Sequence, residues 1–436
     1  MKALLPLIFL FASLASSAQD TLISLNNRIA QLEQQVETLK YTELVQSMSQ
    51  RSLLTPAYFQ ELKALVARQA YNFWKTYNGN PLVSHLNVYS ALYYANKFLG
   101  YDSLNKRAYN QAIGHNESVV SVQFGRDPNY FYSAGSDGRV LRWDVRDPSK
   151  VPELIYHGDH LIRSIDIGQD DEWILVVTKN QGIVLVKNQM TPGETDEPLI
   201  VRDPETVQTA AFIPGEARIL VVNKMGDIKI KGYNGDESIG KTDKNVTSMT
   251  MNESTKDFYL GTQSGNFQIW EDTLARKVYL PESFAINTIA VSSDFKQIAL
   301  GREKGDVLIW DLEEEKFVRK ISGHHSAITD IDFSPDNKLL LTASRDRTVR
   351  VWDIDTPQKL PLVLDDHDDW VMTACFSPNG KQIVSGSKDN YIRLWPLEHS
   401  VLADRICKMV NRNLSQEEWN DYIGSTVDYV NTCPVK

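Results

Sequence analysis

Three sets of histidine, hydroxyl and carboxyl side chains recur at fixed spacing in this sequence. In each set a His is followed 18 residues later by Ser or Thr, 4 residues after that by Asp, and 6 residues further on by Trp. The sets are His115, Ser133, Asp137 and Trp143; His324, Thr342, Asp346 and Trp352; and His367, Ser385, Asp389 and Trp395. Such residues could serve nucleophilic catalysis, in which a His activates a hydroxyl and an Asp orients the His. Three copies in corresponding places cannot all be active sites, so the spacing favours a structural network of hydrogen-bonded polar groups.

The elements that carry these sets form a longer repeat. Tryptophans that end strand-like segments recur at steps of 40, 42 and 43 residues in the C-terminal half: Trp270, Trp310, Trp352 and Trp395. Trp143 lies 127 residues before the first of these, which is three more steps, and the two unoccupied Trp positions fall at Lys187 and Lys231. Both lie in alternating apolar and polar residues after a Gly turn. A period of about 42 residues is typical of a four-stranded propeller blade, and the count is seven.

These motifs resemble the WD40 repeat family over residues 105–397. The resemblance implies a mainly β fold, a seven-bladed β-propeller in which each repeat supplies three strands of one blade and the outer strand of its neighbour. Because the chain turns helical in character after Trp395, residues 107–113 are expected to supply the missing outer strand and close the ring. The family uses the four-residue network to tie the inter-blade turn to the blade. The second to fifth blades depart from it and are predicted to rely on packing alone.

Residues 1–18 have the features of a secretory signal peptide. Lys2 supplies a positive charge, residues 3–14 are apolar, and small residues up to Ala18 fit a cleavage site. The apolar stretch is too short for a bilayer core roughly 30 Å thick, which needs about 20 residues. We therefore expect an exported, soluble protein that is periplasmic or extracellular.

Two helical segments are predicted between the signal peptide and the repeats. Residues 19–50 form an amphipathic helix whose apolar residues alternate steps of three and four, as in a coiled coil: Leu22, Leu25, Ile29, Leu32, Val36 and Leu39. This seam fits a parallel homodimer through residues 22–39, and one helix lying on the propeller explains it equally well. Residues 51–104 are expected to form a helical hairpin, with Thr55 as the cap and Pro56 in the first turn of its first helix.

The C-terminal residues 398–436 are predicted to form a helical tail. Cys407 and Cys433 lie 26 positions apart in it, and export would favour a disulfide between them. Cys375 lies in a strand pattern and is expected to be a small core residue. The tail and the hairpin resemble segments that accompany WD40 propellers in a set of secreted bacterial proteins.

Composition and local patterns argue against several ligands. A formal net charge of −10 without a run of Lys or Arg argues against nucleic acid and anionic membranes. Residues 235–242 match the P-loop nucleotide pattern, but a strand-like segment follows where a helix is needed, and Asp236 and Glu237 would repel phosphates. Neither a metal nor another cofactor is expected, because His157–His160 and Asp365–Asp369 lack the ligand spacing of a known site.

The resemblance implies a contact surface on the narrow face, formed by the inter-blade turns and the turns between the second and third strands of each blade. Counting along the repeats places Trp370 there, with five polar candidates for partner binding: Arg163, Asn180, Lys224, Arg345 and Lys388. Cations beside an exposed aromatic residue on an acidic protein predict an acidic peptide or carboxylate-bearing ligand. Among the equivalent positions of the repeats, Glu303 is the one carboxylate.

We therefore expect a non-enzymatic protein-interaction scaffold of the bacterial envelope or exterior. A structural part of a secretion or surface machine fits the same features. A hydrolase or lyase with its site in the central channel is the alternative, and it requires acids, bases or metal ligands that converge there.

Overall fold

The structure is a computed structural model, and the chain divides into two compact units: residues 1–100 with 399–436, and residues 101–398. It describes residues 5–77, 85–99, 110–168, 171–180, 182–188, 199–201, 207–232, 235–271, 273–280, 282–356 and 359–434. For residues 5–22, 85 and 199–201 it describes the backbone only.

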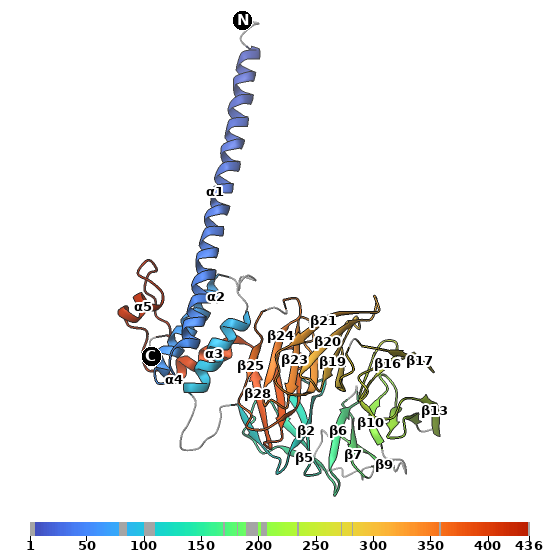
Figure 1. The fold of residues 1–436 in the computed structure, drawn as a ribbon. Coiled ribbons are helices and arrows are strands. Elements are labelled where there is room, and N and C mark those ends of the chain that lie inside the picture. Colours follow the sequence, from blue (N-terminus) through green and yellow to red (C-terminus); the bar gives the residue numbers. More distant parts are fainter. Residues whose placement is uncertain are drawn as a thin grey trace. The chain divides into compact units, whose positions relative to one another are not determined.

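Seven four-stranded antiparallel sheets build the second unit, and each sheet is one blade of a propeller (Figure 1). We letter the strands a to d from the central channel outwards. Blade 1 contains β2 (Val119–Phe124), β3 (Tyr130–Gly135), β4 (Arg139–Asp144) and β5 (Glu153–His157). Blade 2 contains β6 (Ile162–Ile167), β7 (Trp173–Thr178), β8 (Ile183–Lys187) and β9 (Leu199–Val201). Blade 3 contains β10 (Val207–Phe212), β11 (Ile219–Asn223), β12 (Asp227–Gly232) and β13 (Gly235–Lys241).

The C-terminal half of the unit repeats the same meander. Blade 4 contains β14 (Val246–Met251), β15 (Phe258–Thr262), β16 (Phe267–Glu271) and β17 (Leu274–Val278). Blade 5 contains β18 (Ile286–Val291), β19 (Gln297–Arg302), β20 (Asp306–Asp311) and β21 (Lys316–Ser322). Blade 6 contains β22 (Ile328–Phe333), β23 (Leu339–Ser344), β24 (Val349–Asp353) and β25 (Leu362–Leu364). Blade 7 contains β26 (Val371–Phe376), β27 (Gln382–Ser387), β28 (Tyr391–Pro396) and β1 (Gln111–Ile113).

Blade 7 takes its outer strand from the other end of the unit. Strand β1 pairs antiparallel with β28, so that Ala112 lies opposite Ile392. This pairing confirms the predicted closure of the ring, although residues 107–109 of the predicted closing strand lie outside the described residues. Closure matters because it occupies the edge of a strand that would otherwise be open to association.

The apolar core lies between neighbouring blades rather than within one sheet. Trp143 of blade 1 packs in one cluster with Val384 and Leu394 of blade 7. Ile309 of blade 5 shares another cluster with Trp352 of blade 6. A single four-stranded sheet buries little surface alone, so each blade depends on its neighbours for a core.

Two backbone features recur around the ring and set the geometry of its turns. The a and b strands of every blade are out of register by one residue at the same place, as between Val119 and Ser121 or between Ile162 and Ser164, which marks a β-bulge. The third residue of the b–c turn has a positive φ in blades 1 and 3 to 7. It is Gly in four of them, and Arg347 and Asn390 take the same conformation with φ of 72° and 71°.

The described residues of the first unit form five helices: α1 (Leu5–Leu54), α2 (Gln60–Thr76), α3 (His85–Leu99), α4 (His399–Met409) and α5 (Gln416–Tyr422). The C-terminal part of α1 packs on its neighbours, where Val45 and Met48 are buried and the Tyr41 ring stacks on that of Tyr77 at 3.7 Å. Within the described part of the chain, no helix combines the length and apolarity needed to cross a membrane. Residues 1–4 and the side chains of residues 5–22 lie outside the described residues, so the signal peptide stays a prediction.

The predicted start of the helical hairpin is wrong by several residues. Thr55 does not cap α2: its Oγ1 donates to the carbonyl of Arg51 at 2.7 Å, which extends the end of α1. The Lys63 ammonium, reaching back from α2, donates to the carbonyls of Leu53 (3.0 Å) and Thr55 (3.2 Å). A cation at these unpaired carbonyls stabilises the helix end, because it supplies the hydrogen bonds that the helix itself cannot.

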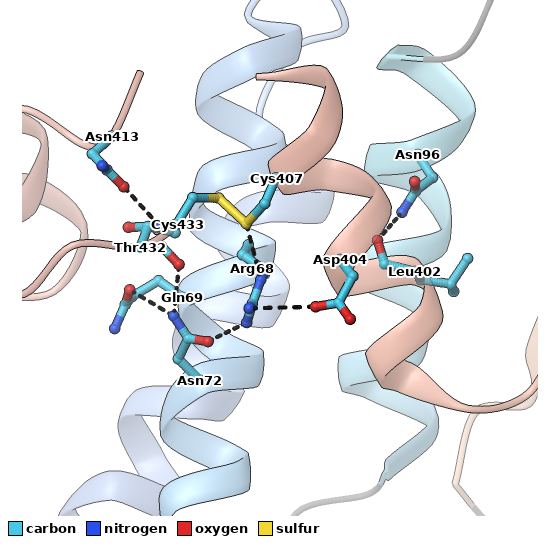
Figure 2. Close-up of a disulfide and its surroundings, with 10 residues drawn as sticks. All are labelled: Arg68, Gln69, Asn72, Asn96, Leu402, Asp404, Cys407, Asn413, Thr432 and Cys433. Carbon is cyan, nitrogen blue, oxygen red and sulfur yellow. Dashed lines mark hydrogen bonds and ion pairs between the residues drawn. A yellow bond between two sulfur atoms is a disulfide. The ribbon is translucent and has the colours of Figure 1, made fainter. Parts of the chain in front are cut away.

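A disulfide between Cys407 of α4 and Cys433 closes the C-terminal tail on the helices (Figure 2). Arg68 of α2 points at this bridge, with Nε 3.3 Å from Cys407 Sγ, and its other end lies 3.8 Å from Asp404. Asn72, one turn further along α2, donates to the carbonyl of Thr432 at 2.9 Å. The tail is thus held by one covalent bond and by polar contacts on both sides of it.

Candidate functional site: the turn face of the propeller

The three predicted four-residue networks form in blades 1, 6 and 7. In blade 6, Trp352 Nε1 donates to Thr342 Oγ1 at 2.9 Å, that hydroxyl lies 2.7 Å from His324 Nε2, and His324 Nδ1 lies 2.8 Å from Asp346. Blade 1 repeats this with Ser133 at 2.8 Å from both Trp143 Nε1 and His115 Nε2, and with His115 Nδ1 3.0 Å from Asp137. In blade 7 the corresponding distances are 3.0, 2.8 and 2.8 Å, and they join Trp395, Ser385, His367 and Asp389.

The carboxylate of each network also holds the inter-blade turn. Asp137, Asp346 and Asp389 each accept the backbone N–H of the residue after the network His at 3.0 Å. Burial alone raises the pKa of the Asp346 carboxyl, but hydrogen bonds from His324, Thr348 and the His325 backbone outweigh it and hold the pKa well below its usual value. The three hydroxyls are fully buried. They are therefore placed to join strands and not to attack a substrate.

Blades 4 and 5 have polar networks of their own, so the prediction that they rely on packing alone is wrong. In blade 4, Gln268 Oε1 accepts from Trp270 Nε1 at 3.0 Å and from Thr242 Oγ1 at 2.7 Å, and Thr242 occupies the place of the network His. In blade 5, the buried Arg302 guanidinium makes two bonds to Asp306, at 2.7 and 2.6 Å. It also donates to the carbonyl of Glu282, in the inter-blade turn, at 3.0 Å. Different residues therefore fasten the same turn to the blade.

A recurring backbone hydrogen bond defines which residues are equivalent on the face that the inter-blade and b–c turns form, here called the turn face. The first residue of the b–c turn donates to the residue before strand a: Ser136 to Ser118, Lys179 to Leu161, Gln263 to Asn245, Glu303 to Ala285, Arg345 to Ala327, and Lys388 to Trp370. All six distances lie between 2.8 and 3.0 Å. In these six blades the bond brings two side-chain positions together on the turn face.

The predicted register of blade 2 is wrong on this criterion. Lys179 occupies the position assigned to Asn180, and Leu161 occupies the position assigned to Arg163. Arg163 lies at the β-bulge of β6, and its Nη1 is 3.4 Å from Gln208. The position that holds the Trp in other blades also falls one residue earlier in blade 2 than predicted. It is occupied by the buried Val186, which pairs with Ile174 as Trp143 pairs with Phe131.

Trp370, Arg345, Lys388 and Glu303 form one group on the turn face, which we call the Trp370 cluster. The Trp370 side chain is 42% exposed. The Arg345 guanidinium lies 5.2 Å from the centroid of its ring and the Lys388 ammonium 4.6 Å. Both distances are within the range of cation–π attraction. Arg345 Nη1 also lies 3.0 Å from Glu303 Oε1, while Arg345 Nε is buried and has no hydrogen-bond partner among the described residues.

The remaining predicted contact residues do not join this cluster. Arg163 and Asn180 belong to blade 2, and Lys224 follows β11 of blade 3, so blade 1 separates all three from Trp370 around the ring. The sequence could not distinguish these positions, because cations recur around the face and only the packing of blades 5, 6 and 7 selects a subset.

Two carboxyl groups line a cavity of about 490 Å³ beside strands a of blades 1, 6 and 7. Asp330 accepts the backbone N–H of Ala374 at 3.0 Å, and Asp332 accepts that of Phe376 at 2.7 Å. Burial raises the pKa of Asp330 to about 6 and that of Asp332 to about 7. Cys375, predicted to be a core residue, is partly buried beside the same cavity. These carboxyl groups join neighbouring inner strands, which the sequence pattern did not reveal.

The motif that matches a P-loop is an outer strand. Residues Gly235–Lys241 form β13, which pairs antiparallel with β12, and the chain continues into β14. Nucleotide binding of the P-loop kind needs a helix whose N-terminus faces the phosphates, and a strand takes its place here. Among the residues that the structure describes, no group of three or more His, Cys, Asp or Glu side chains is arranged to hold a metal ion.

Comparison with known proteins agrees with this geometry. The family model "WD domain, G-beta repeat" matches residues 108–144, 315–353 and 358–396. Periodic tryptophan protein 2 of Saccharomyces cerevisiae is 22% identical over 248 residues, and the match covers 55% of this chain and 25% of that protein. Eukaryotic translation initiation factor 3 subunit I of Drosophila ananassae is 22% identical over 241 residues, covering 55% of this chain and 66% of that protein.

A solved structure with the same fold is the WD40 β-propeller domain of Doa1. Its TM-score is 0.58 at 20% identity, and the match covers 66% of this chain and 96% of that one. The central unit is therefore a seven-bladed β-propeller that carries WD40 repeats. The chain spans less than two thirds of the length of both sequence relatives, and both are eukaryotic. The resemblance to secreted bacterial proteins accordingly stays a prediction.

Proposed function

We propose that this protein is a non-enzymatic interaction scaffold that binds an acidic segment of a partner protein at the Trp370 cluster. The observation that carries the proposal is the exposed Trp370 ring beside two cations, 5.2 and 4.6 Å from its centroid. WD40 propellers generally bind proteins or peptides, and aromatic and Arg side chains are enriched where interfaces gain most of their binding energy. A rigid platform of this kind loses little side-chain entropy on binding, since its members already hold one another.

The cluster favours a carboxylate-bearing ligand for electrostatic reasons. Lys388 has its nearest carboxylate, Asp369, at 3.9 Å, and Arg345 is paired on one side with Glu303. An incoming carboxylate would therefore compete with Glu303 for Arg345, while the apolar part of the peptide covers Trp370. Removing the charge of Glu303 should then strengthen binding, whereas reversing the charge of Arg345 and Lys388 should weaken it.

We further propose that the scaffold acts in the bacterial envelope or outside the cell. The pattern of residues 1–18 supports this location, and so does the Cys407–Cys433 disulfide, since disulfides persist in oxidising compartments. A part in a secretion or surface machine is compatible with the same features.

The test is binding of a fluorescent Glu-rich peptide, measured by anisotropy at low salt, together with affinity capture of partners from envelope fractions. We expect Arg345→Glu with Lys388→Glu to weaken peptide binding by at least about tenfold, which corresponds to about 1.4 kcal/mol. Glu303→Gln should tighten it. Both effects should diminish at high salt, because exposed charges are screened.

A matched control exists on the opposite face of the same two blades. Lys338 and Lys381 lie in the a–b turns of blades 6 and 7, and Lys338→Glu with Lys381→Glu changes the net charge by the same amount. This variant should bind the peptide and capture partners as the native chain does. The proposal is wrong if the control loses binding as much as the cluster variant does, or if neither variant differs from the native chain.

A further inference from the structure

The middle of α1 carries a row of apolar side chains that no described residue of its own unit covers. Leu25, Ile29, Leu32, Val36 and Leu39 are between 45% and 65% exposed. They recur at alternating steps of four and three residues. Figure 1 shows this part of α1 projecting beyond the other helices of its unit. Such a row exposed to water along one helix marks a surface that another element is built to cover.

The same helix uses its opposite side for packing within the chain. Val45, Met48, Ser49 and Ser52 are buried against the other helices of the unit. At about 100° per residue these side chains point roughly opposite to the exposed row. Tyr41 stacks on Tyr77 from the packing side of α1, and the exposed row ends at Leu39. The exposed row is therefore not an extension of the helical unit's own core.

The residue types of the row specify how many helices should meet and in which direction. In heptad notation the a positions are Leu22, Ile29 and Val36, and the d positions are Leu25, Leu32 and Leu39. β-branched residues at a with Leu at d favour two parallel strands. Arg28 then occupies a g position and Glu33 the following e position. In a parallel, in-register pair, Arg28 of each helix lies beside Glu33 of the other, so the opposite charges meet at two symmetric sites. An antiparallel pair would bring g to g and e to e, without this attraction.

We propose that residues 22–39 associate with the same residues of a second copy as a parallel two-stranded coiled coil. Of the two sequence interpretations, the residue types at the a, d, e and g positions favour this one over a helix that lies on its own propeller. The dimer would present two turn faces at once, so a partner with two binding segments would gain avidity without any new contact. The dimer does not depend on the function proposed for the Trp370 cluster, and the two are tested by different measurements.

The first test compares two isoleucines of the same helix in the purified full chain. Ile29 occupies an a position, whereas Ile23 is similarly exposed (52%) but lies outside the seam. Light scattering with size-exclusion chromatography, from micromolar to several hundred micromolar protein, should give twice the mass of one chain for the native protein and for Ile23→Lys. Ile29→Lys should give the mass of one chain, with an unchanged far-ultraviolet spectrum of the folded domains.

The second test addresses the direction of the helices. Arg28→Glu should weaken association because it places two acidic residues opposite each other, and Arg28→Glu with Glu33→Arg should restore it. In addition, Leu25→Cys should form a disulfide between two copies under mild oxidation, since parallel strands place residue 25 beside residue 25. A native chain that stays monomeric throughout, or dissociation by Ile23→Lys as complete as by Ile29→Lys, would overturn the dimer. Failure of the charge exchange and of the cross-link would overturn the parallel arrangement.

Discussion

Replacing Thr342 with Val tests whether the four-residue network holds blade 6 together. Valine has nearly the shape of threonine, so the change removes a hydroxyl without opening a cavity. Trp352 Nε1 then loses its acceptor at 2.9 Å, and His324 Nε2 loses its partner at 2.7 Å. Each buried polar group left without a partner costs about 1–3 kcal/mol, and the hydroxyl itself no longer has to be desolvated. We expect the free energy of unfolding to fall by about 3 kcal/mol, a large part of the 5–15 kcal/mol typical of a domain.

Urea unfolding followed by tryptophan fluorescence measures this loss, and the same blade supplies the control. Thr329 lies in β22, and its Oγ1 makes one hydrogen bond, to the carbonyl of Val371 at 2.7 Å. Thr329→Val therefore removes a single bond and should cost about 1 kcal/mol or less. If Thr342→Val cost no more than Thr329→Val, the network would be a consequence of the blade's packing and not a cause of its stability.

Two further predictions concern the pH dependence of stability and the disulfide. Because the pKa of Asp332 in the folded chain is about 7, against an ordinary value near 3.8, the folded state binds more protons between these values and Asp332 weakens stability as pH rises through them. Asp332→Asn keeps an acceptor for the Phe376 N–H and should therefore gain stability over the native chain at pH 7 but not at pH 4; a difference independent of pH would contradict this. Replacing Cys407 and Cys433 with Ser should destabilise the helical unit by about 3 kcal/mol, since the bond closes a loop of 26 residues. Thermal melting at 222 nm measures that loss, Cys375→Ser serves as the control, and an unchanged melting curve of the double variant would show that the bridge adds no stability.

Much of the fold could be predicted because its pattern repeats. The fixed spacing of the network residues identified blades 1, 6 and 7, and the Trp steps gave the number of blades correctly. The prediction for blade 2 was wrong by one residue because this blade lacks the Trp. The average period placed the Trp position at Lys187, whereas the strand pairing places it at Val186. The replacement networks were missed for a related reason. Arg302 with Asp306 and Gln268 with Thr242 perform the same task with residue types that no repeat pattern marks.

The sequence by itself determined that seven similar sheets would form, since the pattern of strands recurs about every 42 residues and no blade can bury its faces alone. It also determined the heptad row of α1, which depends only on local spacing along one helix. The tertiary structure alone decided which of the predicted contact residues join the Trp370 cluster. Arg345 and Glu303 are 42 positions apart and belong to neighbouring blades, so their contact exists only after the sheets pack radially. Short-range patterns determine elements, whereas a binding surface depends on distances between elements that the pattern does not contain.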